Sequence, residues 1–206
     1  MIRTAPINAS SASRLLGRDR ASESVFSFIL SSPIIILTSI FIKLDSKGPV
    51  FYLQQRSGLN GKVFKIIKFR SMKKDAEKLS GPVWSTKDDP RMTRVGKFIR
   101  KVRIDEIPQM FNVLKGEMSM VGPRPERPYF VEKLAKEIPL YKRRLKVRPG
   151  LTGWAQVKHK YDESIEDVHT KLRYDLFYIE NMSLRMDFKI LFRTIFVVIF
   201  GKGHFE

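Results

Sequence analysis

Two consecutive acidic residues, Asp105 and Glu106, stand in an otherwise basic stretch of the chain. Arg100, Lys101 and Arg103 precede them, and a predicted helix begins directly behind them. Nearby positive charge and helix N–H groups keep a carboxylate ionised, so it can act as a nucleophile or as an oxygen ligand for Mg²⁺. A structural interpretation is also open, with Asp105 as the N-cap and Glu106 as a first-turn residue that complements the helix dipole. The pair is therefore a candidate catalytic centre and a candidate helix start.

An arginine between two prolines follows further along the chain, at Pro123-Arg124-Pro125. Each proline fixes its own φ angle, which limits how far the guanidinium of Arg124 can move. Such an arginine suits a clamp for phosphate. A plain surface turn is the alternative interpretation.

The segment from Arg148 to Trp154 is a second turn-rich stretch. Its glycines permit close approach of the backbone to another chain segment or a ligand. Trp154 could stack on a base, contact lipid or pack in the core, and packing is the default for a tryptophan.

The composition narrows the chemistry further. The 206 residues carry 39 Lys and Arg against 21 Asp and Glu, a net charge of +18, which predicts an anionic partner. The absence of cysteine excludes disulfides, thiolate metal sites and cysteine nucleophiles. The sequence contains neither a phosphate-binding loop ending in Gly-Lys-Ser/Thr nor a dinucleotide glycine fingerprint. His159, His169 and His204 are too scattered to indicate a metal site.

The N-terminal part of the chain predicts a contact with the membrane. Residues 1–24 read as a mobile lead, and residues 25–42 carry no formal charge. Pro33 follows two serines in the middle of this run, which predicts a kink. Basic residues flank the run on both sides, whereas a crossing helix usually has one positive side. We therefore expect a re-entrant helix over residues 25–44, with a crossing helix and a buried soluble helix as alternatives.

The remaining residues, 45–206, predict one compact domain of the α+β class, mostly helical. Residues 50–55 and 63–69 lie around Asn60-Gly61 and predict a β-hairpin, the only clear β element. The expected helical stretches are residues 88–101, 106–114, 165–179 and 184–200. The last helix could lie flat at a membrane surface or dock on the core, because its apolar residues share one face: Leu184, Phe188, Leu191, Phe192, Ile195 and Ile199.

Four segments occur together in a characteristic order. They are Ser32-Pro33, the Lys-Phe-Arg-Ser-Met of residues 68–72, residues 103–116 around Asp105-Glu106, and residues 121–125 followed by the 148–154 loop. In this combination the chain resembles the bacterial monotopic phosphoglycosyl transferases, also called polyprenyl-phosphate sugar-phosphate transferases. The similarity extends from about residue 30 to the C-terminus.

The resemblance implies transfer of a sugar 1-phosphate from a nucleotide diphosphate sugar, usually a UDP-sugar, to polyprenyl phosphate, with release of UMP. It implies Asp105 as the nucleophile that forms a covalent phosphosugar intermediate, Glu106 as its partner, and Mg²⁺ as cofactor, with Asp105 as a candidate ligand. Residues expected to bind phosphate or substrate are Lys68, Arg100, Arg124 and Arg148. Residues expected to shape the motifs are Ser32, Pro33, Pro123 and Pro125.

The resemblance also implies a place and a set of partners. The protein is expected to be monotopic, on the cytoplasmic face of the bacterial inner membrane. Its own amphipathic helices are expected to lie at the membrane interface and to contact lipid. No nucleic-acid partner is expected, and a homo-oligomer stays open. A basic protein that binds nucleic acid or anionic lipid without catalysis is the competing hypothesis, suggested by the net charge of +18 alone.

Overall fold

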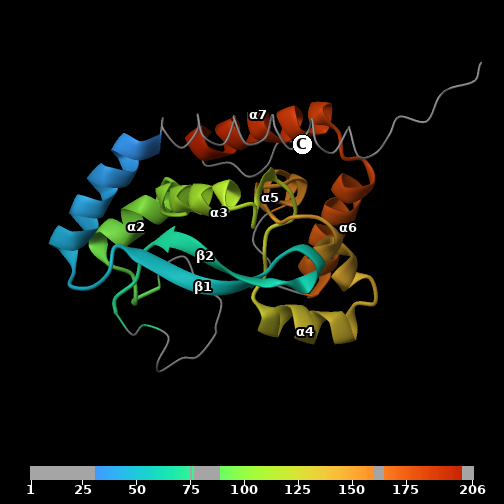
Figure 1. The fold of residues 1–206 in the computed structure, drawn as a ribbon, viewed down its shortest axis with the longest axis horizontal. Helices are drawn as coiled ribbons and strands as arrows, with labels where there is room; N and C mark the ends of the chain where they lie inside the picture. Colours follow the sequence, from blue (N-terminus) through green and yellow to red (C-terminus); the bar gives the residue numbers. More distant parts are fainter. Residues whose placement is uncertain (1–30, 75, 77–88, 160–164, 201–206) are drawn as a thin grey trace, which may run out of the picture.

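Helices surround a β-hairpin in this protein (Figure 1), which confirms the predicted α+β class with mostly helical content. The computed structural model describes residues 31–74, 76, 89–159 and 165–200. The predicted mobile lead, residues 1–24, lies outside the described residues.

The predicted hairpin is confirmed. Strands β1 (Phe51–Ser57) and β2 (Val63–Phe69) pair antiparallel along their whole length. A 3₁₀ turn, η1 (Leu59–Gly61), joins them, with φ of 54° at Asn60 and 80° at Gly61. Asparagine and glycine are the residues that adopt this left-handed conformation at low cost. Strand β1 ends two residues later than predicted, at Ser57.

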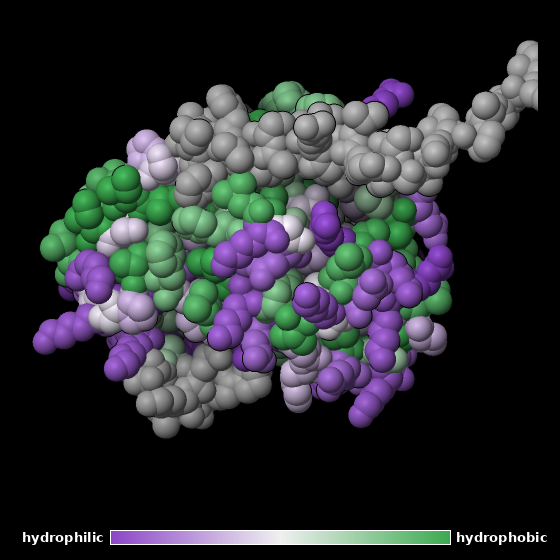
Figure 2. Space-filling model, in the orientation of Figure 1, coloured by the Kyte–Doolittle hydropathy of each residue, from purple (hydrophilic) through white to green (hydrophobic). Residues whose placement is uncertain are grey.

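Residues 31–45 are helical and pack on the end of the hairpin. Ile35 and Ile42 are buried in a cluster with Phe69 and Ile99. The outward residues of this helix are apolar and exposed: Ile34, Ile36, Leu37, Ile40, Phe41 and Leu44. Figure 2 shows the resulting hydrophobic surface on the left of the molecule, over this helix.

No helix in the described part of the chain has the length and apolar character needed to cross a bilayer. The predicted kink at Pro33 depends on the turn before it, which lies outside the described residues. The re-entrant helix over residues 25–44 therefore stays a prediction.

Three partly buried hydrogen bonds hold the C-terminal end of the helix of residues 31–45 against the domain. The guanidinium of Arg70 donates to the carbonyl oxygens of Ser46, at 2.7 Å, and Lys47, at 3.1 Å. The carboxylate of Asp45 accepts from the backbone N–H of Val95 at 3.1 Å. These contacts occupy carbonyl and N–H groups that helix ends leave without an internal partner.

Helix α2 (Arg94–Lys101) begins later than predicted, so the expected start at residues 88–90 is wrong. Thr93 is its N-cap, and the Thr93 hydroxyl accepts from the N–H of Gly96 at 2.9 Å. Asp89 does not cap the helix because its carboxylate pairs with the guanidinium of Arg91. A threonine cap satisfies one of the free N–H groups of a helix as an aspartate would.

The predicted helix over residues 106–114 is present in two parts. A 3₁₀ helix, η2 (Ile104–Gln109), runs directly into α3 (Met110–Leu114). Gly116 follows with φ of 74°, the left-handed conformation that commonly ends a helix.

A second small sheet contradicts the prediction that the hairpin is the only β element. Strand β3 (Ser119–Val121) pairs parallel with β4 (Gly150–Thr152). Three residues are too short a stretch to show the alternation by which strands are recognised. The backbones approach so closely that a Cβ at Gly150 would lie 2.1 Å from the nitrogen of Gly122.

The C-terminal half forms its own apolar core. Helices α4 (Pro128–Glu137) and α6 (Ile165–Glu180) pack together with the 3₁₀ turn η3 (Tyr141–Lys146). Helix α6 confirms the predicted helix at residues 165–179. The buried residues of this core are Val131, Leu134, Ile138, Tyr141, Val168 and Leu172.

The predicted last helix is confirmed as α7 (Leu184–Phe200), which docks on the core through a different stripe from the one expected. Ile190 is fully buried beside Trp154, the first residue of α5 (Trp154–Lys158), and Tyr178. Most of the predicted apolar face is exposed, which fits the alternative of a helix lying at a membrane surface: Leu184, Phe188, Phe192 and Ile195. In Figure 1, α2 and α3 lie between α7 and the hairpin.

Candidate active site

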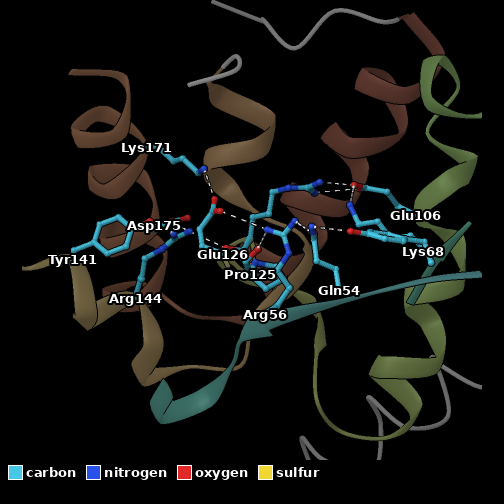
Figure 3. A network of polar contacts seen from close by, with 12 residues as sticks. Gln54, Arg56, Lys68, Glu106, Pro125, Glu126, Tyr141, Arg144, Lys171 and Asp175 are labelled. Atoms are coloured by element: carbon cyan, nitrogen blue, oxygen red, sulfur yellow. Dashed lines mark hydrogen bonds and ion pairs between the residues drawn. The ribbon is translucent and has the colours of Figure 1, made fainter. Parts of the chain in front are cut away.

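Glu106 is the centre of a charged cluster that joins three elements of the fold. It lies on η2, and Lys68 reaches it from the end of β2, with 3.0 Å between Nζ and Oε1 (Figure 3). Arg124, after β3, donates from Nη1 to Oε2 at 3.2 Å and from Nη2 to Oε1. Three residues predicted from separate motifs therefore meet at one carboxylate.

The charges within this cluster stabilise one another. Burial acts to raise the pKa of Glu106, but Arg124 and Lys68 outweigh it and hold that pKa well below its usual value. Glu106 in turn raises the pKa of Arg124. Burial lowers the pKa of Lys68 despite the neighbouring Glu106. Glu106 is thus an ionised anchor for two cations.

Asp105 precedes Glu106 in the sequence, but its carboxylate lacks the hydrogen bonds that Glu106 accepts. Asp105 is buried, with 9% of the residue exposed, and its carboxylate accepts no hydrogen bond from any described residue. Burial raises the pKa of Asp105, Glu106 adds to this, and the charges of Lys68, Arg100 and Arg124 oppose it. Burial thus opposes the neighbouring cations at Asp105, whereas at Glu106 the cations prevail.

The interpretation of Asp105 as a helix N-cap is also wrong. The N-cap position of η2 belongs to Arg103, which has φ of 61° and caps with no side-chain hydrogen bond. The left-handed conformation of Arg103 turns the chain sharply between α2 and η2. Asp105 and Glu106 stand in the first turn of η2, where carboxylates complement the positive end of a helix.

The other predicted phosphate-binding residues differ in position. Arg100 is half-buried on α2, contacts the Sδ of Met92 at 3.5 Å, and acts electrostatically on Asp105. Arg148 is exposed, and its backbone carbonyl lies against Gly122. The structure thus brings Arg100 to the acidic pair, whereas no described contact links the Arg148 guanidinium to it.

Asn112, which the sequence did not single out, fixes η2 and α3 on the hairpin. Its side chain is fully buried, donates to the carbonyl of Lys65 at 2.8 Å and accepts from the N–H of Ile67 at 3.0 Å. A carboxylate oxygen of Glu117 accepts its second N–H at 2.7 Å. A satisfied buried amide of this kind specifies one register between two elements.

The Pro-Arg-Pro turn is held by its backbone. The carbonyl of Pro123 accepts from the N–H of Gly150 at 2.9 Å, that of Arg124 accepts from Arg144 at 2.9 Å, and that of Pro125 accepts from Arg56 at 3.0 Å. Both prolines are buried. The role of Pro123 and Pro125 in shaping the turn stays a prediction.

A second group of ion pairs lies on the side of the turn away from Glu106, as Figure 3 shows. Arg144 pairs with Asp175 of α6 at 2.7 Å, and both side chains are at most 3% exposed. Glu126 pairs with Lys171 at 2.9 Å and with Arg56 at 3.5 Å. Sequence reasoning missed all of these residues, because the pairs join segments far apart along the chain.

The residues of this site lie within the part of the chain that matches a known family. The profile described as bacterial sugar transferase matches residues 18–201. The chain belongs to the bacterial sugar transferase family.

Three relatives show which members of the family this chain is similar to. An Aeromonas hydrophila protein named UDP-N-acetylgalactosamine-undecaprenyl-phosphate N-acetylgalactosaminephosphotransferase is 48% identical over 180 residues, 87% of this chain and 42% of that protein. A Komagataeibacter xylinus undecaprenyl-phosphate glucose phosphotransferase is 42% identical over 187 residues, 88% of this chain and 35% of that protein. The exopolysaccharide production protein PSS of Rhizobium leguminosarum bv. phaseoli is 38% identical over 180 residues, 84% of this chain and 88% of that protein.

This transferase thus spans about two fifths of the Aeromonas relative and about a third of the Komagataeibacter one. Asp105, Glu106, Lys68 and Arg124 all fall inside the residues that match the family. A third acidic or histidine ligand beside Asp105 and Glu106 is absent, since the described residues hold no group of three such side chains.

Proposed function

We propose that this chain transfers a sugar 1-phosphate from a UDP-sugar to undecaprenyl phosphate through a covalent intermediate on Asp105. The observation that carries the proposal is the contrast within the acidic pair. Glu106 accepts three hydrogen bonds from cations, whereas the Asp105 carboxylate beside it accepts none from the described residues. A nucleophile needs a free oxygen and a site that anchors the anionic substrate nearby. The names of the relatives support the acceptor and the sugar phosphate.

The first step is displacement at the β-phosphorus of the donor. An Asp105 carboxylate oxygen forms a bond to that phosphorus, the bond to the oxygen bridging the two phosphates breaks, and UMP leaves with the electron pair. The pyrophosphate carries dense negative charge, which Arg124, Lys68 and Arg100 surround. Catalysis of phosphoryl transfer depends chiefly on such positioning and charge stabilisation.

The second step returns the enzyme to its first state. A phosphate oxygen of the lipid acceptor bonds to the same phosphorus, and the bond from that phosphorus to Asp105 breaks. The product is a polyprenyl diphosphate sugar, and the Asp105 carboxylate is regenerated. A covalent intermediate allows a soluble donor and a lipid acceptor to use one site in turn.

Mg²⁺ is the proposed cofactor, and the chain offers a partial set of ligands for it. Mg²⁺ commonly takes one or two protein carboxylates and completes its shell with water and substrate phosphates. The uncommitted oxygens of Asp105 suit that chemistry, whereas the oxygens of Glu106 already accept from Lys68 and Arg124. When bound, the ion would neutralise charge on the diphosphate.

We also propose that the protein is monotopic, on the cytoplasmic face of the inner membrane. The exposed apolar side chains of residues 31–45 and of α7 support contact with lipid. Accessibility labelling of residues 1–24 in intact cells tests the topology, since a re-entrant helix keeps them cytoplasmic. Periplasmic labelling of these residues would refute the monotopic topology.

Pro33→Ala is expected to straighten the helix and shift it toward crossing the membrane.

The activity is tested by UMP release from a panel of UDP-sugars with undecaprenyl phosphate and Mg²⁺. Intact mass spectrometry of enzyme incubated with the active donor alone is expected to show one added sugar phosphate. Product formation with no such adduct, and only when both substrates are present together, would exclude the covalent route. Salt-dependent DNA binding without UMP release would favour the competing binding protein.

A further inference from the structure

Three cations converge on one tryptophan. Lys158 of α5 lies 5.4 Å from the centre of the Trp154 ring, and Lys189 and Arg193 of α7 lie at 5.3 Å and 5.1 Å. Trp154 is 8% exposed and packs in the core with Ile190. The expectation that Trp154 packs is therefore confirmed, but its ring also collects positive charge.

These three cations have no acidic partner among the described residues. The Nη1 of Arg193 is buried and has no hydrogen-bond acceptor there. Like charges near one another repel, and an aromatic face contributes only about 0.5–2 kcal/mol per cation. A buried guanidinium nitrogen without an acceptor is costly. The cluster therefore has the properties of a site for an anion.

The position of the cluster indicates where that anion comes from. Lys189 and Arg193 lie on α7, whose outer side presents apolar residues to solvent: Leu184, Phe188, Phe192, Ile195 and Val198. A helix with an apolar outer face and adjacent basic residues lies in the membrane interface, with its cations at the level of the lipid phosphates. A lipid phosphate reaches this level without leaving the membrane.

The cluster also adjoins the loop that carries Arg124. The N–H of Gly122 donates to the carbonyl of Thr152 at 2.9 Å, two residues before Trp154. A Cβ at Gly153 would lie 2.1 Å from the oxygen of Gly122, so these backbones touch. Arg124 follows Gly122 by two residues. A phosphate held at Trp154 is thus bound on the same pair of strand ends as the proposed active site.

We propose that Lys158, Lys189 and Arg193, gathered over Trp154, first bind the phosphate of a membrane lipid, and that the lipid is the acceptor polyprenyl phosphate, which then moves to Asp105 to react. The choice of acceptor rests on the proposed function. The site itself rests on the cluster and on the exposed face of α7. An anionic phospholipid headgroup offers the same chemistry, and the experiment separates the two.

The test compares a triple variant, K158Q/K189Q/R193Q, with the full-length parent. Its matched control is K133Q/K136Q/K142Q, which removes three exposed lysines from the α4 side of the molecule, opposite α7 in Figure 1. Both variants lose the same charge. Binding is measured by sedimentation with phosphatidylcholine vesicles that carry undecaprenyl phosphate, phosphatidylglycerol or neither, and folding is checked by circular dichroism.

We expect binding to undecaprenyl phosphate vesicles to fall by about 100-fold in the triple variant and far less in the control. An equal loss on phosphatidylglycerol vesicles, with no preference for undecaprenyl phosphate, would keep the lipid-phosphate site but overturn its assignment to the acceptor. Equal binding by the two variants on all vesicles would overturn the site. If the triple variant is misfolded, R193Q alone is compared with K133Q in the same assay.

Formation of the covalent adduct from donor alone separates this inference from the proposed function. The triple variant is expected to form the adduct at the parent rate and to need a higher concentration of acceptor for the second step. If the parent protein formed no adduct, the covalent route of the proposed function would be refuted. The vesicle-binding result would still stand.

Discussion

Asp105 and Glu106 are neighbours in the chain, yet all three hydrogen bonds from Lys68 and Arg124 go to Glu106. The pKa values of the pair are driven apart for the same reason, upward for Asp105 by burial and downward for Glu106 by its cations. Two carboxylates whose surroundings push their pKa values in opposite directions commonly have different roles. Glu106 is an anchor for positive charge, and the carboxylate of Asp105 accepts no hydrogen bond from the described residues.

Replacing the free carboxylate is expected to stop the reaction without disturbing the fold. Asp105→Asn removes the proposed nucleophile, so turnover should fall by about a thousandfold or more. The substitution breaks no described hydrogen bond, so the melting temperature should stay the same or rise slightly. UMP release and thermal unfolding of the same preparation check both statements. Near-normal turnover would eliminate Asp105 as the nucleophile.

Replacing the anchoring carboxylate of Glu106 is expected to destabilise the fold, unlike the replacement of Asp105. Glu106→Gln leaves Lys68 and Arg124 without their shared counter-charge. Loss of one partner in such a partly buried pair costs about 2–4 kcal/mol of unfolding free energy. Chemical denaturation of Glu106→Gln beside Asp105→Asn measures the difference. Equal stability of the two variants would contradict the division of roles within the pair.

The neighbouring residues Arg143 and Arg144 allow a comparison of an exposed ion pair with a buried one. Arg144 pairs with buried Asp175, whereas Arg143 pairs with Glu180 at 3.6 Å with both side chains more than half exposed. Asp175→Asn leaves a buried charge unpaired and should cost about 3–5 kcal/mol of unfolding free energy. Glu180→Gln should cost less than about 1 kcal/mol. Denaturation curves of the two variants decide this, and similar losses would show that the Arg144 pair has no special weight.

The sequence predicted the residues of the site better than their environment. Lys68, Glu106 and Arg124 lie in short motifs with distinctive residue types, and the structure brings them into contact. Their supports, such as Asn112 and Asp175, are single polar residues whose partners lie far away in sequence. No periodicity marks such residues, because their importance comes from tertiary contacts.

The helices and strands also differ in how well the sequence predicts them. The hairpin and the long helix α6 carry strong local patterns and were predicted with small boundary errors. Strands β3 and β4 are too short for any pattern, and their pairing depends on the close contact at Gly150. For α7 the sequence predicted the helix but not the buried stripe, because apolar residues occur on more than one of its sides.

Glu126 is expected to make the stability of the protein depend on pH. Burial acts to raise its pKa, but Lys171, Arg144 and Arg56 lower it from 4.5 to about 2. A carboxyl whose folded pKa is depressed stabilises the fold above its unfolded pKa, and this contribution is lost as the pH falls toward the folded value. The loss should amount to at most about 3 kcal/mol and should occur between about pH 5 and pH 2.

Glu126→Gln isolates this contribution. At neutral pH the variant should be less stable than the parent, because three cations lose their counter-charge. The gap should narrow as the pH falls, since protonation makes the parent carboxyl neutral as well. Glu137→Gln, an exposed change on α4, serves as the control and should keep the parent pH dependence. Denaturant unfolding at several pH values measures the gap, and a gap that is as wide at about pH 3 as at neutral pH would refute the assignment to Glu126.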